Sequence, residues 1–112
     1  MSMALNKKNR LKKKKDFEGV FKKGKAVKGN FLFVRYLKNN LEFPRFAFVV
    51  SSRVSKKAVV RNRIRRALSE AARSELKNVQ PRDIIMIADK KIADISRENM
   101  IQDTRLVLTK IS

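Results

Sequence analysis

The sequence predicts a single α+β domain, a small two-layer sandwich in which helices pack on a short sheet in the order α-β-β-α-β-α. Its 112 residues suit one domain and are too few for two. Apolar residues make up 43% of the chain, which is enough for one modest hydrophobic core. Segments with helical spacing alternate with short runs of aromatic and branched residues, and no repeat or interior linker separates them. We therefore expect residues 1–112 to fold as one unit.

Residues 1–15 are strongly basic, with seven Lys and Arg and no acidic residue. Their few apolar residues show little periodicity. We expect a flexible, extended arm that becomes ordered when an anion neutralises it. A solubilising tail explains the charge equally well.

The first helix is expected over residues 16–23, DFEGVFKK. Asp16 is a favourable N-cap, and Gly24 suits the position where the helix stops. Phe17 and Phe21 lie one turn apart and share one face of this helix.

Three runs of aromatic and branched residues predict strands. NFLFVRYLK at residues 30–38 and RFAFVVS at residues 45–51 are separated by the turn signal Asn39-Asn40, so we expect an antiparallel hairpin. RDIIMIAD at residues 82–89 is apolar on both faces, which is typical of a strand inside a sheet.

Two further helices complete the predicted fold. Helical spacing begins near Ala58, and neither Pro nor Gly interrupts its apolar stripe before Pro81. The last helix is expected over residues 96–111, with Ser96 as its cap.

The charge of the chain indicates a polyanionic partner. Lys and Arg number 29 against 10 Asp and Glu, a formal net charge of +19, so the folded domain repels itself unless anions share its surface. The absence of Cys and His excludes disulfides, thiolate or imidazole metal sites and nucleophile–histidine catalysis. The carboxylates are too scattered for a two-metal site, so we expect no catalytic or metal-binding residue. No membrane span or secretory signal is predicted, which indicates a cytoplasmic protein.

The most basic segment is RVSKKAVVRNRIRR, residues 53–66, with seven cations and no acid in fourteen positions. On a helix that starts near Ala58, Arg61 and Arg65 are neighbours, and phosphate groups would relieve their repulsion. Free backbone N–H groups at the helix start would add to the anion site. A solvated basic face is the alternative, although such faces usually mix charges. The pattern fits RNA and DNA equally.

Phe17 and Phe21 have two interpretations. Lysines flank both, and rings among cations are typical of single-strand binding, in which bases stack on the rings. Their spacing alone instead favours packing against the sheet. Strand aromatics such as Phe33 and Phe46 are likewise expected in the core.

Three segments resemble the bacterial ribonuclease P protein subunit family. KKAVVRNRIRRALSEAAR at residues 56–73, preceded by FAFVVS, is similar to the family signature. RLKKKKDFEGVFKKGK at residues 10–25 resembles the family's opening helix, and RDIIMIADKK its last strand with the turn that follows. The resemblance implies an unusual left-handed βαβ crossover around the long helix, against the general rule.

The resemblance also implies a function. In this family an RNA subunit, with its Mg²⁺ ions, removes the 5′ leader from precursor tRNA, while the protein binds that RNA and holds the leader. It therefore implies no catalytic residue and no protein-bound cofactor in this chain, and it reverses the core interpretation of the two helix phenylalanines. Carried over by position, the residues implied to contact the RNA subunit are Arg61, Asn62, Arg63, Arg65 and Arg66, and those implied to border the leader cleft are Phe17, Phe21, Arg53 and Lys57.

Two other classes of protein share this size and charge. The main alternative is a small ribosomal protein that binds rRNA structurally. The other is a DNA-binding protein, but the basic helix offers mostly cations and one Asn, which suits backbone binding better than reading of base edges. The nucleic acid that copurifies with the protein would separate the three.

Overall fold

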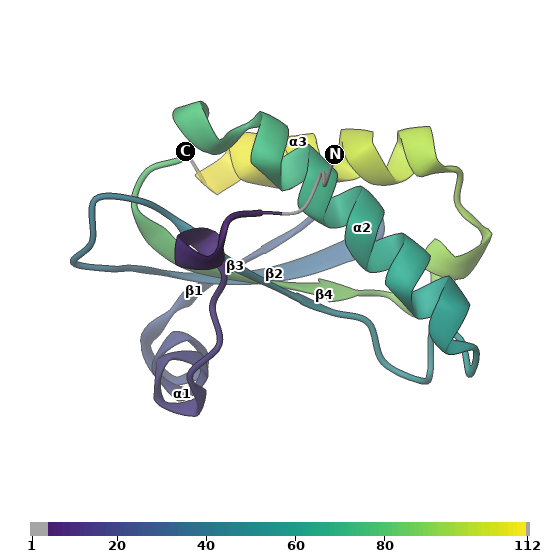
Figure 1. Ribbon diagram of the computed structural model, residues 1–112, viewed down its shortest axis with the longest axis horizontal. Coiled ribbons are helices and arrows are strands. Elements are labelled where there is room, and N and C mark those ends of the chain that lie inside the picture. The colour runs from purple at the N-terminus through teal and green to yellow at the C-terminus, as the bar shows by residue number, and fades with distance from the viewer. Residues whose placement is uncertain (1–4, 112) are drawn as a thin grey trace.

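Residues 5–111, which the computed structural model describes, form a four-stranded sheet with helices on both faces (Figure 1). None of the helices in this range has the length and apolarity needed to cross a bilayer. The strands are β1 (Lys25–Lys28), β2 (Leu32–Lys38), β3 (Arg45–Val49) and β4 (Arg82–Ala88). The helices are α1 (Lys14–Lys23), α2 (Ala58–Ser74) and α3 (Arg97–Ile111), with short 3₁₀ turns η1 (Lys7–Asn9), η2 (Leu76–Asn78) and η3 (Lys90–Asp94).

The α+β class and all the predicted helices and strands are confirmed, but β1 is an additional strand. The order of the longer elements is therefore α-β-β-β-α-β-α. The sequence of β1, KAVK, has mostly exposed side chains and no aromatic residue, so its composition does not indicate a strand. It becomes one by antiparallel pairing with β2.

The predicted hairpin between β2 and β3 is wrong, because β4 lies between them. β4 pairs antiparallel with β2 and parallel with β3. It takes the central place because both of its faces are apolar: Ile84 and Met86 face one side and Ile85 the other, and all three are fully buried. The interior position predicted for this strand is confirmed. The parallel pair makes β3–α2–β4 a βαβ unit, whose left-handed crossover stays a prediction.

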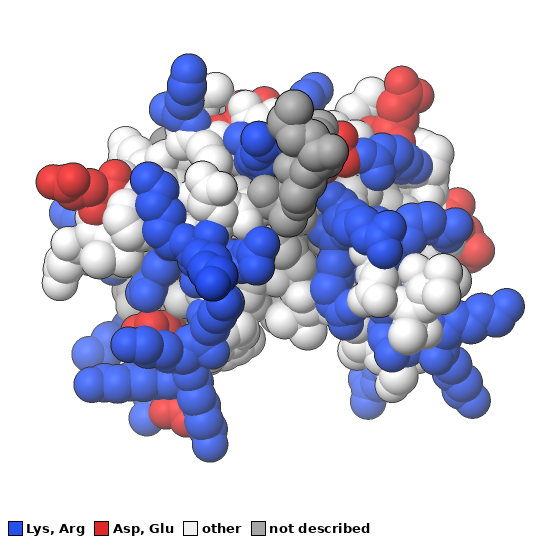
Figure 2. Space-filling view, viewed as in Figure 1, with Lys and Arg blue, Asp and Glu red and all other residues white. Residues whose placement is uncertain are grey.

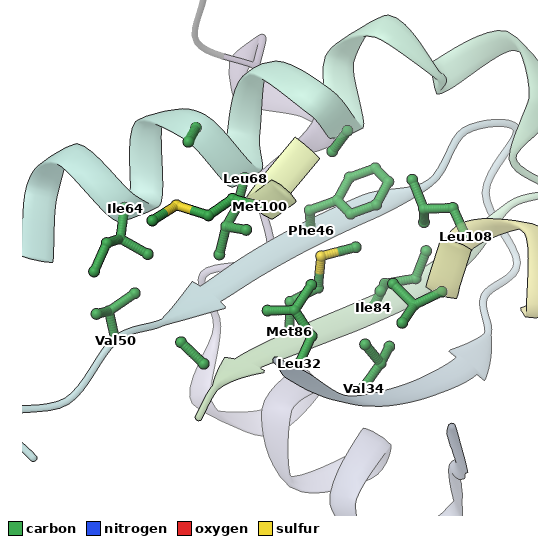
Figure 3. Packing of buried hydrophobic residues seen from close by; sticks show 14 of the residues in the cluster. Leu32, Val34, Phe46, Val50, Ile64, Leu68, Ile84, Met86, Met100 and Leu108 are labelled. Carbon is green, nitrogen blue, oxygen red and sulfur yellow. The ribbon is translucent and has the colours of Figure 1, made fainter. Parts of the chain in front are cut away.

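α2 and α3 cover one face of the sheet and enclose the main hydrophobic core (Figures 1 and 3). Ile64 and Leu68 of α2 and Leu108 of α3 meet Phe46 and Met86 of the sheet, and each side chain is at most 3% exposed. The apolar stripe predicted for the long helix is thus the stripe that packs on the sheet.

Side-chain hydrogen bonds fix α3 at its start and near its middle. The Ser96 hydroxyl accepts from the N–H of Asn99 at 3.2 Å, so the predicted cap of α3 is confirmed. Two turns after Ser96, the buried carboxylate of Asp103 accepts from the N–H groups of Asn30 (2.7 Å) and Phe31 (2.8 Å). α3 is therefore tied to the turn between β1 and β2.

α1 lies on the opposite face of the sheet and packs on a much smaller apolar cluster (Figure 1). The buried members of that cluster are Leu11, Val20 and Ile85. The helix starts at Lys14 rather than at Asp16, and no side chain caps its first turn. Asp16 therefore lies within the first turn, where its carboxylate forms an ion pair described below.

The basic arm differs from the flexible segment that we expected. Residues 1–4 lie outside the described part of the chain, but from Leu5 onward the arm packs against the domain. Leu5 is buried in the main core and Leu11 in the α1 cluster. Between them, the Asn9 amide donates to the Pro44 carbonyl at 2.8 Å, and the Leu11 N–H donates to the Phe46 carbonyl at 2.8 Å. These contacts cover the free edge of β3, which would otherwise offer unpaired backbone groups.

Candidate nucleic-acid interface

Lys and Arg gather on two parts of the surface shown in Figure 2: over α1 at lower left, and around the start of α2 at right. Uncharged atoms are exposed between them. The first part, the α1 surface, comprises Lys12, Lys13, Lys14, Lys15, Lys22 and Lys23. The second, the α2 surface, comprises Arg53, Lys56, Lys57, Arg61, Arg63 and Arg66.

The loop of residues 50–57 connects β3 to α2 and carries half of the α2 surface. Its middle is anchored by Val54, which is buried. On either side, Ser51 Oγ accepts from the Arg53 N–H at 3.3 Å, and Ser55 Oγ accepts from the Lys57 N–H at 3.2 Å. The exposed side chains of Arg53 and Lys57 therefore project from a loop that has its own hydrogen bonds.

Two of the predicted RNA-binding arginines hold this loop in place. Arg61 Nη1 donates to the Ser55 carbonyl at 2.9 Å, and Arg65 Nη2 donates to the Val50 carbonyl at 3.3 Å. Arg65 Nη1 also donates to Asn62 Oδ1 at 2.6 Å. Both side chains are partly buried, and part of their hydrogen-bonding capacity is used within the protein.

The other two arginines of the set are directed differently. Arg63 and Arg66 are exposed and have no hydrogen bond or ion pair within residues 5–111. Ile64, between them in sequence, is fully buried against the sheet. The helix thus presents two unpaired guanidinium groups on the outer side of its first half, and no side chain caps the backbone N–H groups at its start. Five donors on each guanidinium are available to phosphate oxygens.

Phe17 and Phe21 differ in burial. Phe17 is half-buried against the α1 cluster, whereas Phe21 is 46% exposed near the end of the helix. Packing against the sheet therefore accounts for part of the Phe17 side chain, whereas the ring of Phe21 remains exposed to solvent.

The face of the sheet that carries α1 is only partly covered by it. Across the strands, Phe33 of β2 lies opposite Ile87 of β4, which lies opposite Val49 of β3. Phe33 is 36% exposed and Val49 is 37% exposed, so this row remains accessible. The expectation that Phe33 belongs to the core is wrong, because α1 crosses the sheet at the level of Ile85 and Arg35 and leaves the neighbouring row uncovered.

A recess of about 650 Å³ joins this row to the basic loop. Its lining includes Phe33 and Ile87 from the sheet, Arg53 from the loop, and Lys90 and Lys91 from the turn after β4. Of the residues implied to border the leader cleft, Arg53 lines the recess, and Phe17, Phe21 and Lys57 do not. The two lysines were not singled out in the sequence, although a basic pair directly after a buried strand is a signal that could have found them.

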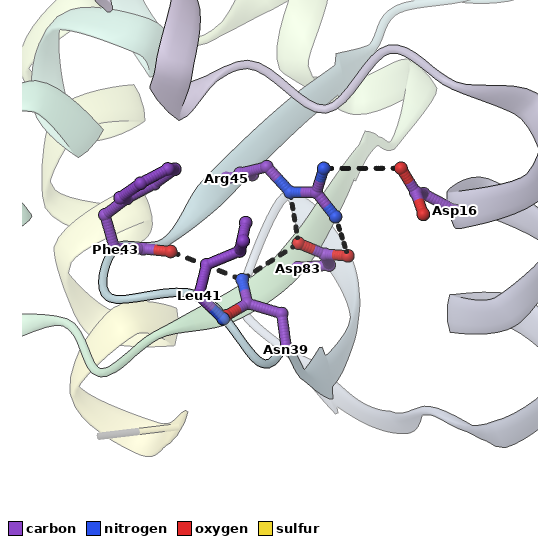
Figure 4. Close-up of polar contacts among 6 residues, drawn as sticks. All are labelled: Asp16, Asn39, Leu41, Phe43, Arg45 and Asp83. Atoms are coloured by element: carbon purple, nitrogen blue, oxygen red, sulfur yellow. Dashed lines mark hydrogen bonds and ion pairs between the residues drawn. The ribbon is translucent and has the colours of Figure 1, made fainter.

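Charged side chains hold the start of α1 to the sheet (Figure 4). Arg45 of β3 donates from Nε and Nη2 to the two oxygens of Asp83 at 2.8 and 2.7 Å, and its Nη1 lies 3.3 Å from Asp16 of α1. The Asn39 amide also donates to Asp83, at 3.0 Å. The hydrogen bond that Arg45 donates to Asp83, reinforced by the charges of both carboxylates, raises the pKa of the Arg45 guanidinium. These carboxylates pair with a cation, and within residues 5–111 no three His, Cys, Asp or Glu side chains gather into a metal site.

Comparisons with known proteins agree with this arrangement. The sequence model of the family described as Ribonuclease P matches residues 5–112. The chain is 35% identical over 107 residues to the ribonuclease P protein component of Syntrophomonas wolfei, which covers 95% of this chain and 89% of that protein. It is 36% identical over 110 residues to the same component of Bacillus velezensis, which covers 96% of this chain and 93% of that protein.

Solved structures give the same result. A Staphylococcus aureus RNase P protein mutant with defective mRNA degradation activity superposes with a TM-score of 0.88 at 30% identity, covering 93% of this chain and 88% of that one. The RNase P protein from Thermotoga maritima superposes with a TM-score of 0.83 at 26% identity, covering 92% of this chain and 97% of that one. Fold, sequence and basic surfaces agree, and the chain belongs to the ribonuclease P protein family, whose members are components of a tRNA-processing ribonucleoprotein.

Proposed function

We propose that this chain binds the catalytic RNA subunit of ribonuclease P and the 5′ leader of precursor tRNA, and so assists endonucleolytic removal of the leader in the cytoplasm. The observation that carries the proposal is the α2 surface, which has six cations and no acidic residue. Within residues 5–111, Arg63 and Arg66 have no protein partner there. RNA phosphates would supply the missing anions, since the planar guanidinium group binds phosphate oxygens in pairs.

The five residues proposed for the RNA-subunit contact then have separate tasks. Arg63, Arg66 and the exposed Asn62 contact the RNA directly. Arg61 and Arg65 contact it with the hydrogen bonds that remain after they hold the loop through the carbonyls of Ser55 and Val50. The α2 surface thereby binds RNA and keeps the neighbouring loop in shape.

The leader is proposed to cross the open side of the sheet. Phe21 is exposed, and a leader base can stack on its ring, with Phe17 supporting it from the half-buried side. The uncovered Phe33 continues this apolar track toward the recess that Arg53 lines, and Lys57 extends the cationic border beside it. Rings for bases and cations for phosphates are the combination that single-stranded RNA requires.

The bond cleavage itself is assigned to the RNA subunit, which would hold the Mg²⁺ ions. With neither His nor Cys, the chain lacks the side chains that most often act as general bases or nucleophiles. Its contribution is electrostatic, because 29 cations offset the repulsion between two RNA molecules. Less Mg²⁺ should then be needed for the same rate.

A cleavage assay tests these assignments. Precursor tRNA is incubated with protein alone, RNA subunit alone and both, over a range of Mg²⁺ concentrations. We expect no cleavage by the RNA-free protein, and a lower Mg²⁺ requirement for the mixture than for the RNA alone. Cleavage by protein alone would contradict the assignment of chemistry, and an unshifted Mg²⁺ requirement would favour a structural role of the ribosomal-protein kind.

A further inference from the structure

The last turn of α1, which carries Phe21, is attached to the sheet by one side chain of β2. Arg35 Nη2 donates to the Phe21 carbonyl at 2.6 Å and to the Gly24 carbonyl at 3.2 Å, and it lies 3.5 Å from the Val20 carbonyl. Carbonyls at the end of a helix have no partner within the helix, and a cation there also interacts favourably with the helix dipole. Arg35 therefore caps α1 from a different element.

The backbone geometry shows how closely this end of the helix approaches the strand. A Cβ atom on Gly24 would lie 2.3 Å from the Val20 carbonyl oxygen and 2.7 Å from the Tyr36 carbonyl oxygen. Both atoms belong to the backbone and cannot move aside as a flexible side chain would. A side chain at this position would push α1 away from β2, so Gly24 permits the contact that Arg35 then fixes.

The position of Arg35 in the sheet connects the turn that carries Phe21 with the strand that carries Phe33. Strand alternation puts Phe33 and Arg35 on the same face of β2, and the guanidinium of Arg35 bonds to the backbone of Phe21. Within residues 5–111 no carboxylate pairs with Arg35, and its Nε has no hydrogen-bond partner. The hydrogen bonds of Arg35 all go to the end of α1, so the contacts observed for this side chain are those that hold the last turn of the helix.

We propose that Arg35 is a positioning residue for the leader site, which sets the distance and orientation of Phe21 relative to Phe33. The inference rests on the proposed leader binding. It differs from a general structural role because α1 is already held at its other end by Arg45, Asp83 and Asp16. Loss of Arg35 frees only the turn that carries Phe21, while the main core on the other face is untouched.

The test measures the preference of the reconstituted ribonucleoprotein for precursor tRNA over leaderless tRNA, together with the affinity of the protein for the RNA subunit. Phe21→Ala is expected to lower the leader preference about thirtyfold, the middle of the range for loss of one stacked base. Arg35→Met should lower it by a similar factor and leave the affinity for the RNA subunit unchanged. Arg35→Lys, which keeps the charge and has a single donor nitrogen in place of three, should recover part of the preference.

A double-mutant cycle separates positioning from independent effects. Combined with Phe21→Ala, Arg35→Met should cause little further loss, because the ring that it positions is already absent. The matched control is Arg82→Met: this arginine of β4 lies over the Tyr36 ring, 5.3 Å from its centroid, and strand alternation puts it on the face of the sheet opposite α1, so the leader preference should be unchanged.

The outcomes distinguish the two proposals. If Phe21→Ala lowers the leader preference while Arg35→Met and Arg35→Lys do not, or if the losses simply add, Arg35 has no positioning role. If Phe21→Ala itself leaves the preference intact, the proposed leader site fails and the inference fails with it. Hydrogen exchange at the amides of residues 20–24 gives a second readout that does not require RNA, and Arg35→Lys should accelerate it.

Discussion

The two faces of the sheet are stabilised in different ways. On one face, α2 and α3 enclose the main core, where side chains such as Phe46 and Ile84 are almost fully buried. On the other face, α1 covers a small cluster and is held by charged side chains near both of its ends. Stabilisation by apolar burial scales with the area removed from water, so the first face supplies most of the stability. The second face leaves rings accessible, so the RNA contacts proposed there would leave the main core closed.

The largest expected difference between the two faces is in stability, and two adjacent isoleucines of β4 allow it to be measured. Ile84 faces the main core and Ile85 the α1 cluster, and both are fully buried. We expect Ile84→Ala to lower the free energy of unfolding by about 4 kcal/mol and Ile85→Ala by about 2 kcal/mol, since the thinner α1 side can collapse into the cavity. Unfolding in urea measures both values. Equal losses would mean that the two faces contribute alike to stability.

Phenylalanines on the two faces provide a test of function. Phe21→Ala should weaken binding of precursor tRNA relative to leaderless tRNA by about 1–3 kcal/mol, the value of one base stacked on a ring. Phe48 packs beside the main core, with its ring stacked on that of Phe46. Phe48→Ala should reduce stability and leave the leader preference unchanged, as measured on the fraction that remains folded. A loss of leader preference in both variants would remove the distinction between the faces.

The fold was predictable where a local pattern decides the structure. The start of α2 at Ala58, the cap at Ser96 and the interior place of β4 follow from spacing and side-chain chemistry within a few residues. β1 was not predictable, because the sequence KAVK forms a strand only by pairing with β2. The pairing of β3 with β4 rather than with β2 was missed for a related reason: a short loop suggests a hairpin, and the competing strand lies 37 residues further along.

The residues that make up the candidate site were predictable from the sequence, but the contacts that each of them makes were not. Four arginines of α2 look alike in sequence, yet Arg61 and Arg65 donate to loop carbonyls while Arg63 and Arg66 do not. Alternation predicts that Phe33 and Phe46 each lie on one face of a strand, but not how far a helix covers that face. Long-range contacts such as Arg45 with Asp83, 38 residues apart, likewise leave no local signal.

A salt titration sharpens the assignment of the α2 surface. Arg63→Ala combined with Arg66→Ala should reduce the slope of log K against log salt for binding to the RNA subunit by about 1.4–1.8, which is two lost phosphate contacts. Arg61→Ala combined with Arg65→Ala should change the slope less, because part of the hydrogen bonding of these side chains is within the protein. Equal changes in slope for the two pairs would show that all four arginines contact phosphates to the same extent.

Sulfate should stabilise the isolated protein, and this effect, although the smallest, locates the anion site. A net charge of +19 on one small domain is repulsive, and an anion that binds only the folded state raises the free energy of unfolding by mass action. At ten times its dissociation constant, sulfate would add about 1.4 kcal/mol. Arg63→Ala combined with Arg66→Ala should reduce this gain, because these exposed guanidinium groups have no carboxylate partner within residues 5–111. Lys22→Ala combined with Lys23→Ala removes the same charge from the α1 surface and should preserve more of it. The measurement is the urea midpoint of each variant in dilute buffer with and without sulfate, with sodium chloride of equal ionic strength as the control for screening. An equal gain in all variants would mean that sulfate acts through general screening or exclusion, and the α2 surface would then not be a specific site for anions.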